Sequence, residues 1–390
     1  MTSIINKYEA STGADRKHFG GIISNYILLS RQQQLASSAE GIGEPRYNVD
    51  GTPDTIPWSR PQYDGPALRA LSILNFLNIP VEVPASADEQ RLRTLALTVL
   101  RTDLTYVTQK WNLPSYDLWE ELLGFHFYTQ VVQASALNQG IHFFTAENDP
   151  EFADQLRTSS EAIRIHLAKY WNSTLGYIGA SKGLQQAPDS QYKISNLDTA
   201  VILGILHGPE IFEFDDEKAL STLRTLETAF ASEYKINKRN RVPAIGRFTD
   251  DVYFHGNPWY MTTAAFAEYY FKLASQLSSR PTIQVNAANG DFYNAALSFS
   301  RSPVRWNAGK IIQMQSVDGQ RLLNALRKKG EAYLRVLKKY VGSQGEMSEQ
   351  FDREAGVPVS APHLTWSYAS FLTAASAREK LISDTQKSHP

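Results

Sequence analysis

Two neighbouring glutamates follow a tryptophan in the segment Tyr116–Glu121, which reads Tyr-Asp-Leu-Trp-Glu-Glu. A carboxyl group next to an aromatic ring and a second carboxylate holds its proton more readily, because its charged form is poorly solvated and repelled. Such a group suits a general acid. The same pair also suits the first turn of a helix, where carboxylates oppose the helix dipole. Taken alone, the pair favours the helix start.

A further glutamate, Glu349, lies in the polar segment Gly345–Phe351, ahead of a late helical stretch. A lone glutamate in such a loop is normally solvated, and it becomes informative only as a partner. Hydrolysis of a glycosidic bond uses two carboxyl groups: one protonates the leaving oxygen, and the other activates a water on the opposite face of the sugar. Glu120 and Glu349 are far apart in the sequence, so only the fold can bring them to one substrate.

Two more groups of residues are candidates for binding. Trp58 and Arg60 lie just before Asp64, which we expect to be the N-cap of a helix that carries Pro66 in its first turn. The alternative for this segment is a well-capped helix with an exposed arginine.

Farther along the chain, Arg247 and Asp251 precede Trp259. An arginine with an aspartate can hold sugar hydroxyl groups through two hydrogen bonds, or the two residues can form a structural salt bridge. Trp366 stands either at the rim of a pocket or inside the core.

Apolar residues recur at spacings of three and four along most of the chain, which is the pattern of helices that bury one face. No linker or low-complexity segment interrupts this pattern, so we expect one all-α domain over residues 1–390. The predicted helices are eleven, near residues 21–38, 64–78, 89–111, 124–140, 149–171, 195–207, 216–234, 258–277, 289–299, 317–341 and 362–382.

The composition excludes several classes of protein. Lysine and arginine number 39 and aspartate and glutamate 40, and this net charge of −1 does not favour binding to nucleic acids or anionic membranes. No apolar run approaches the ~20 residues of a transmembrane helix, and the first residues do not resemble a signal peptide. The absence of cysteine excludes disulfides and cysteine–zinc sites. The eight scattered histidines predict no metal site, and we expect no cofactor.

In their order along the chain, these segments resemble the fungal glucoamylases, glycoside hydrolase family fifteen. The resemblance extends from about residue 20 to 382 and is carried by GIGEPRYNVDGT, WSRPQYDGPALRA, YDLWEE, IGRFTDDVY, GNPW, GEMSEQFD and HLTWSYAS. It implies an (α/α)6 barrel, in which helical hairpins form a double ring with a pocket at one end. It also implies an inverting exo-hydrolase that releases β-D-glucose from the non-reducing ends of starch, glycogen or maltooligosaccharides. On this basis we expect a monomer acting on α-1,4-glucans, without nucleic-acid or membrane partners.

The resemblance also implies roles for single residues. Glu120 corresponds to the general acid and Glu349 to the general base that activates water. Glu121 and Gln350 are their neighbours at the substrate, and Arg247 holds the sugar near the cleaved bond. The other residues expected to contact substrate are Arg46, Trp58, Arg60, Asp64, Trp119, Asp251, Trp259 and Trp366.

The sequence departs from the family pattern near its start. Family members carry a first long helix and then a segment similar to Tyr-Phe-Tyr-x-Trp-Thr-Arg-Asp-Ser, whose Arg-Asp pair clamps the terminal glucose, and no such segment is found in this chain. We therefore expect an N-terminally truncated barrel with about eleven of its twelve helices, and no starch-binding module. The alternative function is that of a degenerate glycan-binding or inactive remnant that lacks this clamp.

Overall fold

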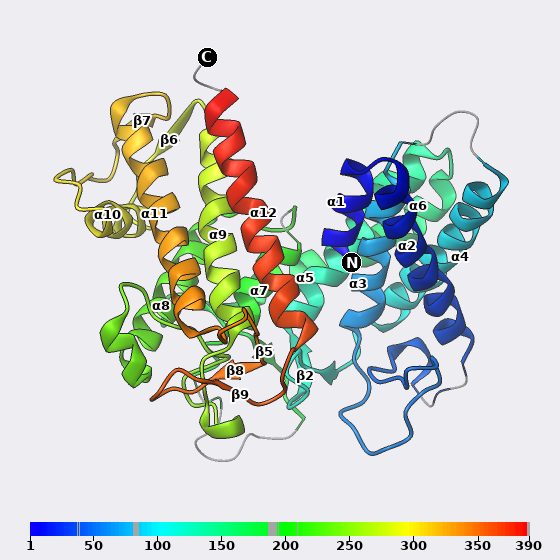
Figure 1. Ribbon diagram of the computed structural model, residues 1–390. Coiled ribbons are helices and arrows are strands. Elements are labelled where there is room, and N and C mark those ends of the chain that lie inside the picture. The colour runs from blue at the N-terminus through cyan, green and yellow to red at the C-terminus, as the bar shows by residue number, and fades with distance from the viewer. Residues whose placement is uncertain are drawn as a thin grey trace. The chain divides into compact units, whose positions relative to one another are not determined.

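The computed structural model describes residues 1–387 except 37, 39, 81–85, 186–192, 194 and 209 (Figure 1). The chain folds into two compact units. The first contains residues 1–170 and the described residues from 181 to 185, and the second contains residues 171–180 and the described residues from 193 onward. The single domain expected over residues 1–390 stays a prediction, and its last three residues lie outside the described part of the chain.

The first unit is mainly helical, with three short strands. Its elements are α1 (Thr2–Ala10), α2 (Gly13–Leu35), η1 (Gly41–Gly43), α3 (Asp64–Leu77), α4 (Ala87–Lys110), β1 (Ser115–Tyr116), β2 (Leu123–His126), α5 (Phe127–Ala146), α6 (Pro150–Leu167), η2 (Ala168–Tyr170) and β5 (Ser181–Lys182).

The core of the first unit surrounds α5, in which every side chain from Phe127 to Leu137 is buried. The helices α3, α4 and α6 pack against it. Neighbouring elements therefore cover this part of α5 on all sides. The strand β2 runs directly into α5 and pairs antiparallel with both β1 and β5, so this central helix fixes the position of the small sheet.

The second unit contains the remaining elements. These are β3 (Trp171–Asn172), β4 (Tyr177–Ile178), α7 (Ala200–His207), α8 (Glu217–Glu233), η3 (Lys235–Arg239), η4 (Tyr253–His255), α9 (Tyr260–Ser278), β6 (Thr282–Gln284), α10 (Gly290–Phe299), β7 (Ile311–Gln313), α11 (Val317–Tyr340), β8 (Gln350–Phe351), β9 (Pro358–Val359) and α12 (Thr365–Lys387).

The helix α9 has the same role in the second unit that α5 has in the first. Every side chain from Tyr260 to Phe271 is buried, and α7, α11 and α12 pack against it. Figure 1 shows α9 between α11 and α12. The strands form antiparallel pairs, β3 with β4, β6 with β7 and β8 with β9, and the last of these pairs follows the loop that carries Glu349.

Side-chain caps explain where several of these helices begin. Ser86, Asp149, Asp216 and Ser316 each accept a hydrogen bond from a backbone N–H in the first turn of α4, α6, α8 and α11. Such a bond satisfies one of the N–H groups that have no partner inside the helix. Asp64 does not fit this pattern: it is the first residue of α3 rather than its N-cap, and the capping position, Tyr63, makes no side-chain cap.

Twelve α-helices lie within the part of the chain that the structure describes, and eleven of them correspond to the predicted stretches. The additional helix is α1, which buries Ile5 and packs on α2 and α3. Residue 37, inside the predicted helix 21–38, lies outside the described residues. Within the described ranges, every helix is too short or too polar to span a membrane.

Candidate active site

Glu120 lies in the loop of the hairpin formed by β1 and β2, where Tyr116 pairs with Leu123. Asp117 holds this loop by accepting hydrogen bonds from its backbone N–H groups. Its carbonyl oxygen accepts from the Glu120 N–H at 2.9 Å, and its Oδ1 accepts from the N–H groups of Glu121 at 2.7 Å and Leu122 at 2.9 Å. Because β2 separates this loop from α5, the alternative interpretation of the acidic pair as the first turn of a helix is wrong.

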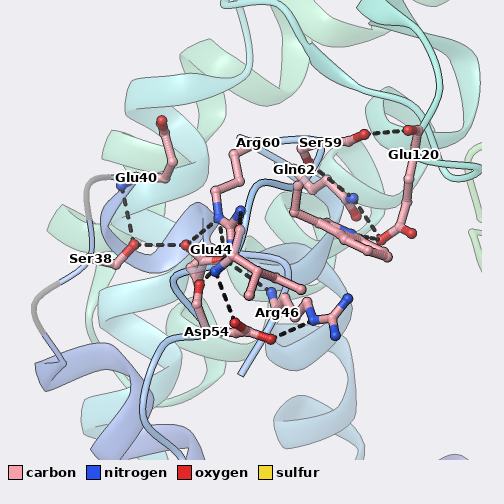
Figure 2. Close-up of polar contacts among 11 residues, drawn as sticks. Ser38, Glu40, Glu44, Arg46, Asp54, Ser59, Arg60, Gln62 and Glu120 are labelled. Atoms are coloured by element: carbon pink, nitrogen blue, oxygen red, sulfur yellow. Dashed lines mark hydrogen bonds and ion pairs between the residues drawn. The ribbon is translucent and has the colours of Figure 1, made fainter. Parts of the chain in front are cut away.

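Three residues of one loop hold Glu120, and we call Trp58, Ser59, Gln62 and Glu120 the Glu120 cluster. Trp58 Nε1 donates to Glu120 Oε1 at 2.9 Å, and Gln62 Nε2 donates to the same oxygen at 3.0 Å. The Ser59 hydroxyl donates to the main-chain carbonyl of Glu120, as Figure 2 shows. The loop therefore contacts both the carboxyl group and the backbone of this residue.

Arg60 fastens the loop to the rest of the first unit (Figure 2). Its Nε lies 2.8 and 2.9 Å from the two carboxylate oxygens of buried Glu44. Its two terminal nitrogens donate to the carbonyl groups of Ile56 at 2.7 Å and Asp54 at 2.5 Å. Contacts of this kind give Arg60 a supporting role in the loop, and its predicted contact with sugar stays a prediction.

Trp58 is the exposed member of the Glu120 cluster, and Arg46 stacks on its ring. The Arg46 guanidinium lies 4.2 Å from the centre of the Trp58 ring and pairs with Asp54 at 2.7 Å. Trp58 is 43% exposed, which is unusual for so large an apolar side chain. Stacking with a cation fixes the orientation of this ring and leaves an aromatic surface next to Glu120.

Asp64 adds an unusual charge environment at the start of α3. Its carboxyl group is buried, and burial is the main reason that its pKa rises from 3.8 to about 6. The charges of Glu120 and Asp117 raise the pKa further, against backbone hydrogen bonds that lower it. Of the two predicted neighbours of Glu120, Trp119 is buried and Glu121 is half-buried.

Glu349 lies in the second unit, just before β8. Its Oε2 accepts from Gln350 Nε2 at 3.1 Å and from the Ser360 hydroxyl. Its own N–H donates to the carbonyl of Ala361 at 2.8 Å. The pairing of β8 with β9 brings the Ser360 segment to Glu349, and fully buried Gln350 accepts from Asn257 Nδ2 at 3.2 Å.

Arg247 and Asp251 form a buried ion pair in the same unit. Arg247 Nε lies 2.8 Å from Asp251 Oδ2, and Nη2 lies 2.5 Å from Oδ1. The guanidinium is 5.0 Å from the ring centre of Tyr253 and 5.5 Å from that of buried Trp259. The structural salt bridge considered for this pair is therefore present, while a contact between Arg247 and sugar stays a prediction.

Tyr253 was not among the predicted site residues. Burial raises its pKa, the negative charge of Glu349 raises it further, and Arg247 and a hydrogen bond with Ser360 lower it. We call Tyr253, Glu349, Gln350 and Ser360 the Glu349 cluster. Trp366, which is half-buried, stands in the first turn of α12.

The loop that carries Tyr253 has a strained backbone. Phe254 and His255 have φ values of +48° and +70°, in the left-handed region that side chains disfavour. Arg353 donates to the carbonyl groups of His255 at 2.9 Å and Gly256 at 3.3 Å, and also to Glu233. These bonds from a single arginine hold the strained loop in place.

The model of the glycosyl hydrolases family 15 matches residues 17–376. The chain belongs to this family. A glucoamylase from Blastobotrys adeninivorans is a family 15 relative with 32% identity, over 98% of this chain and 64% of its own length. The chain spans about three fifths of the length of the curated relatives that it matches.

Solved glucoamylase structures have the same fold as this family 15 chain. The glucoamylase from Saccharomycopsis fibuligera superposes with a TM-score of 0.85 at 28% identity, over 97% of this chain and 84% of that one. The enzyme from Hypocrea jecorina gives 0.84 at 29%, over 97% and 63%. These similarities confirm the prediction of an all-α chain of the (α/α)6-barrel class.

Some residues of the Glu120 cluster and the Glu349 cluster were not predicted from the sequence. Ser59 and Gln62 lie inside the segment that carries the resemblance, so their position between Trp58 and Asp64 was the available signal. Ser360 had no such signal, because only the pairing of β8 with β9 brings it to Glu349. Within the described residues, no group of histidine, aspartate or glutamate side chains is arranged to hold a metal ion.

Proposed function

We propose that this protein is a glucan 1,4-α-glucosidase, which releases β-D-glucose from the non-reducing ends of α-1,4-glucans with inversion. The observation that carries the proposal is the carboxyl group of Glu120, held at one oxygen by two side-chain donors in a hairpin loop. The relatives named glucoamylase support the class of substrate.

In this proposal Glu120 is the general acid. Trp58 and Gln62 both donate to Oε1, and among the described residues no group donates to Oε2. Oε2 is therefore the oxygen that carries the proton to the glycosidic oxygen, which leaves with the electron pair of the broken C–O bond. Two donors on the other oxygen fix the direction in which that proton points.

Glu349 is the general base. Gln350 and Ser360 donate to its Oε2, and no group in the described part of the chain donates to Oε1. Oε1 is then the oxygen that removes a proton from the attacking water, whose oxygen forms the new bond to the anomeric carbon. An inverting hydrolase uses one acid and one base in a single displacement, and Glu120 and Glu349 are the residues proposed for these two roles.

The other predicted residues divide by exposure into two kinds of proposed role. Trp58 and Arg46 are accessible and suit direct contact with sugar. Arg60 and Asp64 are enclosed and suit support of the Glu120 cluster. Half-buried Glu121 and Trp366 also suit direct contact with sugar. For the buried residues Trp119, Arg247, Asp251, Trp259 and Gln350, the role at the substrate implied by the resemblance stays a prediction.

The test is hydrolysis of maltose, followed by NMR so that the anomer formed first is identified. We expect β-glucose from the unmodified chain and a loss of at least ~100-fold in kcat for Glu120→Gln and for Glu349→Gln, since each removes a proton transfer. Glu354→Gln is the control, because Glu354 is exposed and its carboxylate pairs with Lys235, which belongs to neither cluster. It should retain full activity.

Two outcomes would contradict the proposal. Normal hydrolysis by both glutamine variants would remove the assigned acid and base. Calorimetric binding of maltose by the unmodified chain without any release of glucose would favour the glycan-binding remnant instead.

A further inference from the structure

The backbone of Glu120 adopts a conformation that a residue with a side chain disfavours. Its φ is +65°, in the left-handed region. Such a conformation persists only when the surrounding structure holds it, and it recurs at functional sites. The side chain of a residue follows its backbone, so a change in this conformation would turn the carboxyl group away from its two donors.

One side chain holds this backbone from outside the hairpin. Asp117 fixes the N–H of Glu120 and the two residues after it, whereas the Glu120 carbonyl group accepts from the Ser59 hydroxyl. Ser59 is half-buried and lies between Trp58 and Arg60, and Arg60 is fastened to Glu44. The hydroxyl group therefore links the strained residue to a loop that is itself rigidly held.

We propose that Ser59 is a positioning residue for Glu120: its hydroxyl holds the left-handed main chain of Glu120 so that Oε2 faces the leaving oxygen of the substrate. This inference rests on the proposed function. Trp58 and Gln62 hold the carboxyl group directly, and Ser59 holds the peptide from which that group extends. Its contribution is thus to proton transfer and not to sugar binding.

The first measurement compares Ser59→Ala with Ser59→Thr on maltose. Alanine removes the donor, and we expect kcat to fall about 10-fold while KM changes less than about 2-fold, because only an interaction realised in the transition state is weakened. Threonine keeps the hydroxyl, so it should restore most of kcat. Equal kcat values for Ser59→Ala and the unmodified chain would overturn the proposal.

The second measurement uses α-D-glucosyl fluoride, in which the C–F bond breaks and fluoride leaves with the electron pair. Fluoride needs little protonation, so misplacing a general acid matters less for this substrate than for maltose. We expect Ser59→Ala to retain most of its kcat on the fluoride. An equal loss on both substrates would show a general structural defect and would contradict a role through Glu120.

Ser221→Ala is the matched control, since the Ser221 hydroxyl also donates to a distant carbonyl group, that of Gly176 at 2.5 Å. It should leave the ratio of kcat on the two substrates unchanged, and thermal unfolding of all variants shows whether each is folded. Glu120→Gln distinguishes a failure of the proposed role of Ser59 from a failure of the proposed function. If it loses maltose hydrolysis while Ser59→Ala does not, the inference alone is wrong; if it keeps maltose hydrolysis, the proposed function is wrong and the inference fails with it.

Discussion

At the scale of single residues, the two proposed catalytic carboxyl groups have a common design. Each has one oxygen that accepts from two side-chain donors: Trp58 and Gln62 for Glu120, and Gln350 and Ser360 for Glu349. Hydrogen bonds to one oxygen restrict rotation of the group and orient the other oxygen. The order of residues identified the glutamates as candidates, but it did not identify their donors.

Asp64 gives a prediction about pH at the same scale. Its pKa is about 6 in the folded protein and near 3.8 in the unfolded chain. A raised folded pKa means that its favourable contribution is complete below about pH 3.8 and is lost as the pH rises through 6. The unmodified chain should therefore lose up to about 3 kcal/mol of stability relative to Asp64→Asn over this range.

Urea unfolding at several pH values between 3.5 and 7 measures this difference. Asparagine has the shape of the aspartate but does not ionise, so the free energy of unfolding of the variant lacks this dependence. Glu161→Gln, which changes an exposed residue of α6, is the control and should follow the unmodified chain. A constant difference between Asp64→Asn and the unmodified chain at all pH values would contradict the prediction.

At the scale of elements, a short hairpin and not a helix carries Glu120, the proposed general acid. The strands β1 and β2 pair through only a few residues. The loop between them therefore depends on Asp117 for its shape. The acidic pair was ambiguous because a helix start and a hairpin loop both favour carboxylates near free N–H groups. Pairing of β2 with β5, from a segment far along the chain, removes this ambiguity.

The hydrogen bonds of this loop predict that two substitutions of Asp117 differ in their effects on stability and on kcat. Alanine leaves the buried N–H of Leu122 and that of Glu121 without their acceptor, so Asp117→Ala should lower the free energy of unfolding by about 1–3 kcal/mol. It should also lower kcat, because Glu120 lies in the same loop. Asparagine keeps an acceptor oxygen, and Asp117→Asn should lose less of both quantities.

Thermal unfolding and maltose kinetics on the same preparations measure the two effects. Similar stability and kcat for the alanine and asparagine variants would show that the accepted hydrogen bonds do not shape the loop.

At the scale of the whole molecule, each unit is built around one helix whose N-terminal part is buried on all sides, α5 in the first and α9 in the second. Close packing around such helices requires small residues at the points of nearest approach. Gly330 on α11 is one of these, since a Cβ atom there would lie 2.7 Å from the ring of buried Phe271 on α9.

Gly330→Ala should therefore destabilise the protein by about 1–3 kcal/mol, because a rigid ring in a filled core cannot move aside. Gly21→Ala on α2 is the matched control, as no atom lies within 4 Å of its added methyl group. That change should be neutral or stabilise by up to about 1 kcal/mol, since alanine favours helix. Equal denaturation midpoints for the two variants would contradict the packing argument.

The sequence by itself determined the helical class, the approximate positions of eleven helices, the family and the two candidate glutamates. These properties depend on local periodicity and on the order of short motifs, both of which are readable along the chain. It did not reveal α1, because a helix of 9 residues that buries only Ile5 is too short for a helical period to be recognised.

Only the tertiary structure decided which groups surround each glutamate. Glu120 meets Trp58, Ser59 and Gln62, and Glu349 meets Ser360, through loops whose approach is set by distant helices and by short strand pairs. Packing over long sequence separations determines such contacts, and no local pattern encodes them. For the same reason, the ion pairs of Arg60 and Arg247 were not distinguishable in the sequence from arginines that are free to hold a sugar.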